Sequence, residues 1–442
     1  MKRQGAGVLC VSAALASMLL AAAPAPTKSS LPAMSFAAAT QMKLPNGVII
    51  ASQPSADVPV VGVQVFVPGG LVQQPGNKAG IASVTAALVL QTKVEGSTTL
   101  SQAAALAGGS VSYTLDPLDT RYYLECHEAD FARLFHDLRV ALGHPDVSQL
   151  AAQRTQAIAN ANALTENPLE AAYAMVRQVR YRGTGFALPD QGSSVTIAGL
   201  SGADVAAFVA SYTHGSGTIV ALEGAVTQPL IAAAAHEFES LPASTPAPVP
   251  APNAVVRLHQ IVAHRNVLAP WVAVAYEAPG QYSSDFAPML VIEALLGSGG
   301  DVHSFNYTSN ELAPQDFVGA YYQYEVSPGS MIVFLGGANE NLDQSVRDLE
   351  TGIARLRGDN ISATLISEAK KTALGDYFLS VTRFDDLAWL LGRSAASPEG
   401  VAFENNVPQR IMSVKAADIQ RVARHYLTKE TIAIVLPASA GR

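Results

Sequence analysis

Residue types that carry metal or acid–base chemistry are few and scattered in this sequence. Its nine histidines stand at positions 127, 136, 144, 214, 236, 259, 264, 303 and 425. No two of them are three or four residues apart, the spacing that places two imidazoles on one helix face. His127 and His236 are each followed by a glutamate but have no second ligand at helical distance. We interpret both as surface or capping residues.

Motifs for nucleophilic catalysis and for phosphate binding are also missing. The sequence contains no Gly-x-Ser-x-Gly elbow and no catalytic Cys-His pattern. The glycine-rich run at 297–300 lacks the Lys and Ser/Thr that complete a phosphate-binding loop. The net charge is −8 and no basic run occurs, which argues against a nucleic-acid-binding protein.

The N-terminus has the pattern of an export signal. Lys2 and Arg3 precede an apolar stretch from Val8 to Ala23, and small residues follow it. The stretch is short for a membrane-spanning helix, which needs roughly 20 apolar residues. We therefore predict a signal peptide over residues 1–25 and a periplasmic or secreted mature chain without a stable membrane span. Removal of the signal peptide leaves Cys126 as the single cysteine of the sequence, so no internal disulfide is expected.

The rest of the chain repeats itself. The alternating apolar run that ends at Pro68 and Gly69 returns 211 residues later at Pro279 and Gly280. Further matches recur at offsets of 213 and 214 residues, among them Tyr212 with Tyr426. Between the copies, residues 241–252 are rich in Pro and Ala and predict an extended linker. We expect two domains of the same origin, at about 40–240 and 253–440.

Each copy shows the same order of elements. Strands are predicted at Val60–Val67 and Val272–Tyr276, and buried helices follow at Ile81–Leu90 and Phe286–Leu296. Alternating residues then predict hairpins at Ser110–Cys126 and Val318–Gly336. Amphipathic helices and one last strand complete each copy. The expected fold class is α+β, with an antiparallel-rich sheet packed with helices in each of two homologous domains.

The opening of the first copy resembles the insulinase-like zinc peptidases of the M16 family. The similar residues are Leu-Pro-Asn-Gly-Val at 44–48, Pro-Gly-Gly at 68–70 and Gly-Ile-Ala at 80–82. The order of elements in both copies extends the resemblance over nearly the whole mature chain. It implies the two-domain, processing-peptidase-like branch of that family, in which the two domains together form half of a clamshell.

In active members, the helix that begins with the Gly-Leu-Ala-like residues continues into His-x-x-Glu-His, whose histidines bind zinc while the Glu polarises its water. Here Ser83, Ala86 and Ala87 stand at those positions, and Asn160 falls near the position of the third ligand. Alanine has no ligand atom, and a serine hydroxyl is a poor zinc ligand. The resemblance therefore implies an inactive homologue without bound metal, so zinc is expected only in a partner subunit.

Two features of the second copy match substrate-handling elements of the family. Tyr321 falls where the resemblance places a tyrosine that stabilises an oxyanion, although its usual arginine partner is missing from 309–314. Gly297, Gly299 and Gly300 resemble the glycine-rich loop of the non-catalytic processing-peptidase subunit. A strand tyrosine packed at a domain face and a helix C-cap are the structural alternatives for these two features.

Two functions are consistent with these observations. In the first, the chain is a non-catalytic subunit that pairs with an active M16 homologue and helps to bind peptide substrate. In the second, it is a stand-alone periplasmic peptide-binding or chaperone-like protein that adds extended peptides to the edge strand near Ser110–Thr114. In neither case is the chain expected to cut peptides by itself.

Overall fold

The computed structural model describes residues 38–55, 58–244, 259–297, 317–336, 342–358, 361–379 and 383–438. The described residues all belong to one compact unit. The predicted signal peptide and most of the predicted linker lie outside the described residues. No helix among the residues that the structure describes is both long and apolar enough to cross a membrane.

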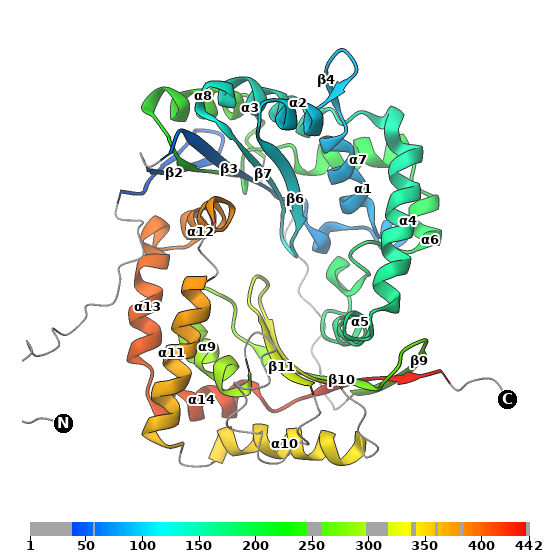
Figure 1. Ribbon diagram of the computed structural model, residues 1–442, viewed down its shortest axis with the longest axis vertical. Coiled ribbons are helices and arrows are strands. Elements are labelled where there is room, and N and C mark those ends of the chain that lie inside the picture. The colour runs from blue at the N-terminus through cyan, green and yellow to red at the C-terminus, as the bar shows by residue number, and fades with distance from the viewer. Residues whose placement is uncertain are drawn as a thin grey trace, which may run out of the picture. The chain divides into compact units, whose positions relative to one another are not determined.

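The first sheet has six strands in the order β1-β2-β8-β3-β7-β6 (Figure 1). Strands β2 and β8 are parallel, and every other neighbouring pair is antiparallel. Valine and isoleucine recur along the central strands, where branched side chains suit a buried pleated surface. The strands are β1 (Thr40–Lys43), β2 (Ile49–Pro54), β3 (Val60–Val67), β6 (Ser110–Leu115), β7 (Thr120–His127) and β8 (Ile219–Gly224). A short separate hairpin is made by β4 (Lys93–Glu95) and β5 (Thr98–Thr99).

The second sheet has five strands in the order β11-β12-β10-β13-β9. Its one parallel pair is β9 with β13, which corresponds to β2 with β8 in the first sheet. The strands are β9 (His259–Arg265), β10 (Trp271–Ala278), β11 (Phe317–Gln323), β12 (Gly329–Gly336) and β13 (Thr431–Pro437). The α+β class with two related, antiparallel-rich sheets is thus as predicted, whereas β2 and β9 were not expected from the sequence.

Helices cover the sheets and enclose a separate hydrophobic core on each. Those that follow strands of the first sheet are α1 (Ile81–Leu90), α2 (Leu100–Leu106), α3 (Glu128–Gly143), α4 (Leu150–Glu166), α6 (Ser194–Ala198), α7 (Gly202–Tyr212) and α8 (Gln228–Glu239). Those of the second part of the chain are α9 (Phe286–Leu296), α10 (Leu342–Gly358), α11 (Ala363–Leu379), α13 (Phe403–Ser413) and α14 (Ala416–Tyr426). The predicted helices Ile81–Leu90 and Phe286–Leu296 have the predicted bounds.

Two further helices each pack on the sheet of the other part of the chain (Figure 1). Helix α5 (Pro168–Arg180) belongs to the first part of the chain but packs on β10 and β13 of the second sheet. Helix α12 (Phe384–Ala396) belongs to the second part but packs on β8, β3 and β2 of the first sheet. The face of each sheet opposite its own main core is therefore covered by a helix from the other part of the chain.

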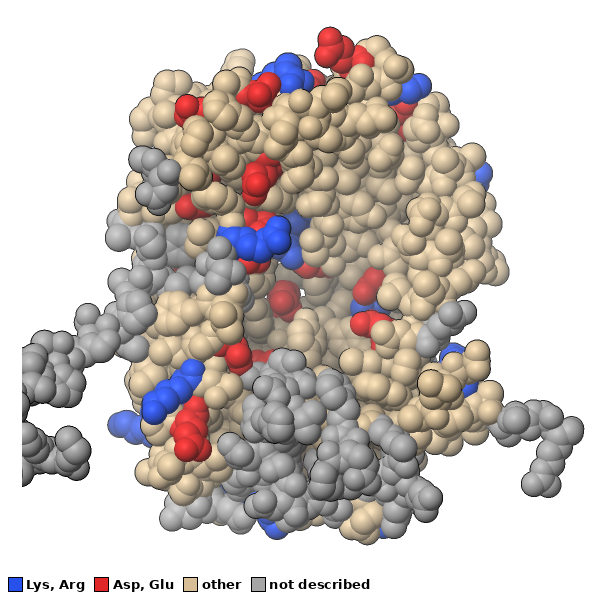
Figure 2. All heavy atoms as spheres, in the orientation of Figure 1, with Lys and Arg blue, Asp and Glu red and all other residues tan. Residues whose placement is uncertain are grey.

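Charged side chains are sparse on the surface. Figure 2 shows Lys, Arg, Asp and Glu as isolated groups on a face made mostly of other residues, in keeping with a charged fraction of 14%. Cys126 is a buried free cysteine of strand β7.

Candidate functional site

The positions of the missing zinc motif lie on helix α1, at the start of the first helical layer. Gly80 caps the helix in the left-handed region, and Gln74 Oε1 accepts hydrogen bonds from the backbone N–H groups of Gly80 at 2.8 Å and Ala82 at 3.4 Å. This side chain satisfies two of the donors that a helix start leaves free. The helix is thus held in place by contacts that do not involve a metal.

Ser83 is turned toward a loop from much later in the chain. The residue is buried, with 3% of its surface exposed, and its hydroxyl donates to Gln191 Oε1 at 2.7 Å. Ala86 is fully buried in the core of the first sheet. The three positions therefore offer one hydroxyl, which is already hydrogen-bonded, and two methyl groups.

The loop that carries Gln191 fits closely against the helix start. Gly192 has a φ of +74°, and a Cβ there would overlap the carbonyl of Ala79. A Cβ on Gly80 would likewise lie 2.8 Å from the carbonyl oxygen of Gln191. Glycine is required at both positions by the close backbone approach. Among the residues that the structure describes, no three His, Cys, Asp or Glu side chains gather as a metal site would need.

Asn160 is not brought to these residues. It lies on the exposed face of helix α4, where its Oδ1 accepts a hydrogen bond from Gln156 Nε2 at 2.9 Å. Helix α4 packs on α1, and its buried positions nearest to Asn160 are Ala157 and Ala161. The residue after Asn160 is the inward-facing Ala161, and alanine has no atom that can bind a metal.

Tyr321 stands on β11, an edge strand of the second sheet, and is 44% exposed. Its ring meets the ring of Tyr173 edge to face, with centroids 6.2 Å apart. A tyrosine phenol is protonated at neutral pH and its partial burial raises its pKa further, so the hydroxyl can donate a hydrogen bond.

Beyond Tyr173 lies Arg177, which the sequence analysis did not predict as a site residue. The Arg177 guanidinium is 5.5 Å from the centre of the Tyr173 ring and 2.5 Å from Asp190 Oδ1. It also donates to the carbonyl of Leu188 at 2.8 Å. Asp190 directly precedes Gln191, the partner of Ser83. A continuous set of contacts thus runs from Tyr321 of the second sheet to the helix with the missing zinc motif.

Tyr173, Arg177, Asp190 and Gln191 border a cavity of about 290 Å³. Its walls come from Ala161 of α4, Tyr173 and Arg177 of α5, and the loop from Pro189 to Ser194. Although burial alone lowers it, the pKa of Arg177 is raised overall, with the Asp190 carboxylate as the main cause. The cavity therefore presents a fixed cation and an aromatic ring, which can bind and orient a polar group but cannot activate water as a zinc ion does.

Sequence reasoning missed Tyr173, Arg177, Asp190 and Gln191. The signal that could have found Arg177 is the helix itself, because it is amphipathic and yet places Arg177 and Arg180 among buried residues. Arginine is seldom buried without a specific partner.

Gly297 ends helix α9 and sits close to Tyr321. Its φ of 105° lies in the left-handed region, and its carbonyl accepts a hydrogen bond from the N–H of Ala320 at 2.7 Å. The structure therefore shows a helix C-cap at Gly297 and attaches it to the strand that carries Tyr321. Gly299 and Gly300 lie outside the described residues.

Comparisons with known proteins point to one family. Residues 199–373 match the family model described as "Peptidase M16 inactive domain". No curated protein matches the sequence significantly. Among solved structures, a protease from Helicobacter pylori superposes with a TM-score of 0.80 at 18% identity, over 90% of this chain and 99% of that one.

Two further solved structures are similar over most of their length. A peptidase M16 inactive domain from Pseudomonas fluorescens gives a TM-score of 0.79 at 16% identity, over 91% of this chain and 99% of that one. A chain of complex III2 from Candida albicans gives 0.74 at 13% identity, over 90% and 95%. Likeness at these identities shows the fold. Residues 199–373 are therefore similar in sequence to the M16 inactive domain, and the chain as a whole shares the fold of these solved structures.

Proposed function

We propose that this chain is a non-catalytic subunit that pairs with an active, zinc-bearing M16 homologue and supplies part of the peptide-binding surface. One observation carries the proposal. Helix α1 packs in the core of the first sheet, its ligand positions hold Ser83, Ala86 and Ala87, and the Ser83 hydroxyl is hydrogen-bonded to Gln191. The fold is complete in the region where the chemistry is missing.

A subunit role also accounts for the residues around Tyr321. The phenol is partly exposed, protonated, and connected through Tyr173 to the buried Arg177. Such a group can donate a hydrogen bond to a substrate carbonyl or to an oxyanion that a zinc site elsewhere generates. In this proposal the zinc belongs to the partner, and this chain holds none.

Two further expectations belong to the proposal. The mature chain is exported through its N-terminal signal and acts in the periplasm or outside the cell. The likeness to a chain of complex III2 supports a role within an assembly, because that protein is by its description part of a complex.

The test is co-expression with an M16 homologue from the same organism that has an intact His-x-x-Glu-His motif. We expect the two chains to co-purify and peptide cleavage to require both. The matched control replaces the first zinc histidine of the partner by alanine, which should abolish cleavage without preventing assembly. A partner that cleaves equally fast alone, or two chains that never co-purify, would contradict the subunit role.

The second candidate, a stand-alone peptide-binding protein, rests on strand β6. Within the described part of the chain this strand pairs with β7 alone and forms the edge of the first sheet, and its residues alternate between exposed and half-buried. An extended peptide could add to that edge through backbone hydrogen bonds. Binding of a fluorescent extended peptide to this chain alone, lost when alternate peptide amides are N-methylated, would favour this function.

A further inference from the structure

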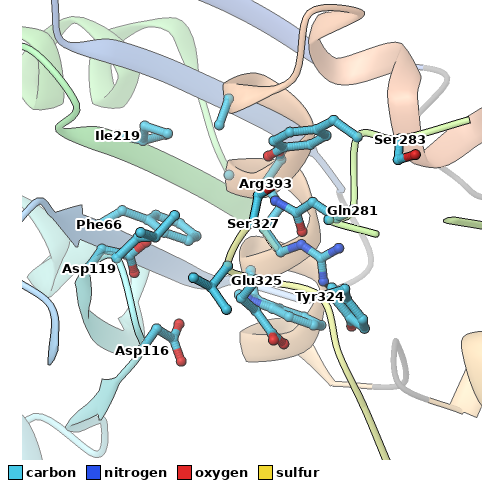
Figure 3. Close-up of a pocket in the computed structure, with 17 residues that line it drawn as sticks. Phe66, Asp116, Asp119, Ile219, Gln281, Ser283, Tyr324, Glu325, Ser327 and Arg393 are labelled. Carbon is cyan, nitrogen blue, oxygen red and sulfur yellow. The ribbon is translucent and has the colours of Figure 1, made fainter. Parts of the chain in front are cut away.

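A cavity of about 500 Å³ lies away from the site described above, where turns of both sheets meet helix α12. One wall is the turn between β6 and β7, which carries Asp116 and Asp119. Another is the turn between β11 and β12, which carries Glu325. Figure 3 shows the two aspartates on one side, Arg393 of α12 on the other, and Glu325 between them.

Three hydrogen-bond acceptors at this cavity have no donor. Asp119 Oδ1, Glu325 Oε2 and Gln281 Oε1 are shielded from solvent and lack a hydrogen-bond partner. All three residues border the cavity. Burying an acceptor without a donor costs free energy, so such groups are normally satisfied. Because the terminal torsions of Asp, Glu and Gln are soft, either oxygen can be turned toward the cavity at little cost.

The two arginines near the cavity each interact with a neighbouring side chain, although the Arg393 Nε–H is shielded from solvent and has no hydrogen-bond acceptor. Arg121 forms an ion pair with Asp116. Arg393 is only 7% exposed, donates to the Tyr324 hydroxyl at 3.1 Å and lies 3.7 Å from Glu404 Oε1. Within the described part of the chain, Asp119 and Glu325 have no such ion pair. The residues that border the cavity thus include three carboxyl groups, from Asp116, Asp119 and Glu325, and one guanidinium group, from Arg393.

Part of the remaining wall is apolar. Phe66, Ile219 and Trp389 border the cavity, with Phe66 beside Asp119 (Figure 3). The Trp389 ring already accepts cations, since the guanidinium carbons of Arg121 and Arg393 lie 5.3 and 4.3 Å from its centre. A wall of this kind suits the methylene groups of an alkyl chain that ends in a cation.

We propose that this cavity is a binding site for a guanidinium or alkylammonium group, held by Asp119, Glu325 and Gln281 Oε1, with its alkyl chain against Phe66 and Trp389. Such a group has several N–H donors and a positive charge, which matches the three acceptors and the uncompensated carboxyls. The proposal does not depend on the proposed subunit role. The source is either a free small amine or a basic side chain of a peptide.

Binding of this kind depends on pH in a defined direction. Burial, followed by the nearby Asp116 carboxylate, raises the pKa of Asp119 to about 8; Glu325 adds to this, while Arg121 and Arg393 oppose it. Asp119 is therefore largely protonated at neutral pH without a ligand. A bound cation favours the carboxylate, so that a proton leaves on binding. Affinity should rise as pH approaches about 8 and level off above it, by up to about tenfold per unit.

The test is isothermal titration calorimetry on the mature chain with three probes. Agmatine is a free guanidinium amine, N-acetyl-arginine N-methylamide presents the same group as a peptide side chain, and the citrulline analogue is its neutral isostere. We expect at least one cation to bind about tenfold or more tighter than the citrulline compound, and tighter at about pH 8.5 than at about pH 6.5. Binding of agmatine alone identifies a free amine as the ligand, and binding of both identifies a side chain.

Neutral isosteres of the two carboxyls complete the test. Asp119→Asn and Glu325→Gln should each weaken cation binding by about tenfold or more, and Asp119→Asn should also remove the pH dependence. Glu128→Gln, at an exposed carboxyl of α3, is the matched control and should change neither. Unfolding temperatures verify that the variants fold. No cation binding, equal binding of citrulline, or full binding by folded Asp119→Asn would overturn the proposal and leave a cavity that holds water only.

Discussion

Arg180 and Ser330 join the two parts of the chain through a buried hydrogen bond. The Arg180 Nε donates to the Ser330 hydroxyl at 2.8 Å, across 150 residues of sequence. The Tyr181 hydroxyl lies at the same distance from the same oxygen. Ser330 belongs to β12 and is fully buried. Helix α5 is thus attached to the second sheet at its C-terminal end by one serine that serves two polar side chains.

Replacement of this serine should be costly. Ser330→Ala leaves a buried arginine and a buried tyrosine without their shared partner, which we expect to lower the free energy of unfolding by about 1–3 kcal/mol. Thermal or urea denaturation measures the change. Ser413→Ala removes an exposed hydroxyl from α13 and should stay within about 0.5 kcal/mol of the wild type. Equal stability of the two variants would show that Ser330 does not hold α5 in place.

The buried carboxyl of Glu223 should make stability depend on pH. Glu223 lies on β8, is 3% exposed, and burial raises its pKa to about 8, against the opposing hydrogen bond from the Gly224 N–H. Between the unfolded pKa of 4.5 and the folded pKa, the unfolded chain has released this proton while the folded chain keeps it. Stability from this group is therefore complete below about pH 4.5 and is lost as the pH rises to about 8.

Glu223→Gln removes that dependence. We expect the variant to have nearly wild-type stability at about pH 5 and to be more stable at about pH 8.5, by an amount on the order of a few kcal/mol. Differential scanning calorimetry at both pH values gives the comparison. The exposed Glu128→Gln should show no such trend. A Glu223→Gln variant that is equally destabilised at both pH values would mean that the carboxyl is ionised in the folded protein.

Local pattern predicted much of the fold, but not the contacts between distant segments. The bounds of Ile81–Leu90 and Phe286–Leu296 could be predicted because Gly80 precedes the first helix, Gly297 follows the second, and the apolar residues between the ends are nearly continuous. The spacing of apolar residues predicts that α5 and α12 each have an apolar face, but it does not predict which sheet packs on that face. Both sheets offer an apolar face, so the sequence pattern cannot predict that each helix packs on the sheet of the other part of the chain.

The candidate site was predicted in part for the same reason. The resemblance located Ser83, Ala86 and Tyr321 because each lies within a local pattern. The link between them runs through Gln191, Asp190 and Arg177, and these residues stand in a loop and on a helix without a motif. The bond from Ser83 to Gln191 spans 108 residues, and no local rule specifies a partner at that distance.

The zinc expectation can be tested directly. We predict that the purified mature chain retains only substoichiometric zinc after dialysis against a chelator, because α1 offers one hydroxyl and two methyl groups at the ligand positions. Elemental analysis measures the metal, and the zinc-bearing partner serves as the positive control. About one zinc per chain that survives dialysis would mean that other residues bind it, since structural sites hold zinc tightly.

Tyr321→Phe tests the substrate contact within the proposed complex. If the hydroxyl donates to the oxyanion, its loss should lower kcat by roughly tenfold to a few hundredfold with little change in KM. Tyr426→Phe, on α14, is the control with the same chemical change. A Tyr321→Phe complex with unchanged kcat would assign this residue to packing against Tyr173.

The exchange of helices predicts opposite effects for two helical glycines. Gly392 lies on α12, where a Cβ would overlap the ring of Phe66 on β3. Phe66 is only 4% exposed and belongs to the small cluster between α12 and the first sheet. Gly375 lies on α11, and a Cβ there would meet nothing within 4 Å.

We therefore expect Gly392→Ala to lower the free energy of unfolding by about 1–3 kcal/mol, since a methyl group forced into a packed contact moves the helix off the sheet. Gly375→Ala should raise it by about 0.5–1 kcal/mol, because alanine has the better helix propensity and the unfolded chain loses entropy. Denaturation curves of both variants under one condition give the sign of each change. If Gly392→Ala were stabilising as well, helix propensity alone would govern α12, and its close packing on the first sheet would not contribute to the fold.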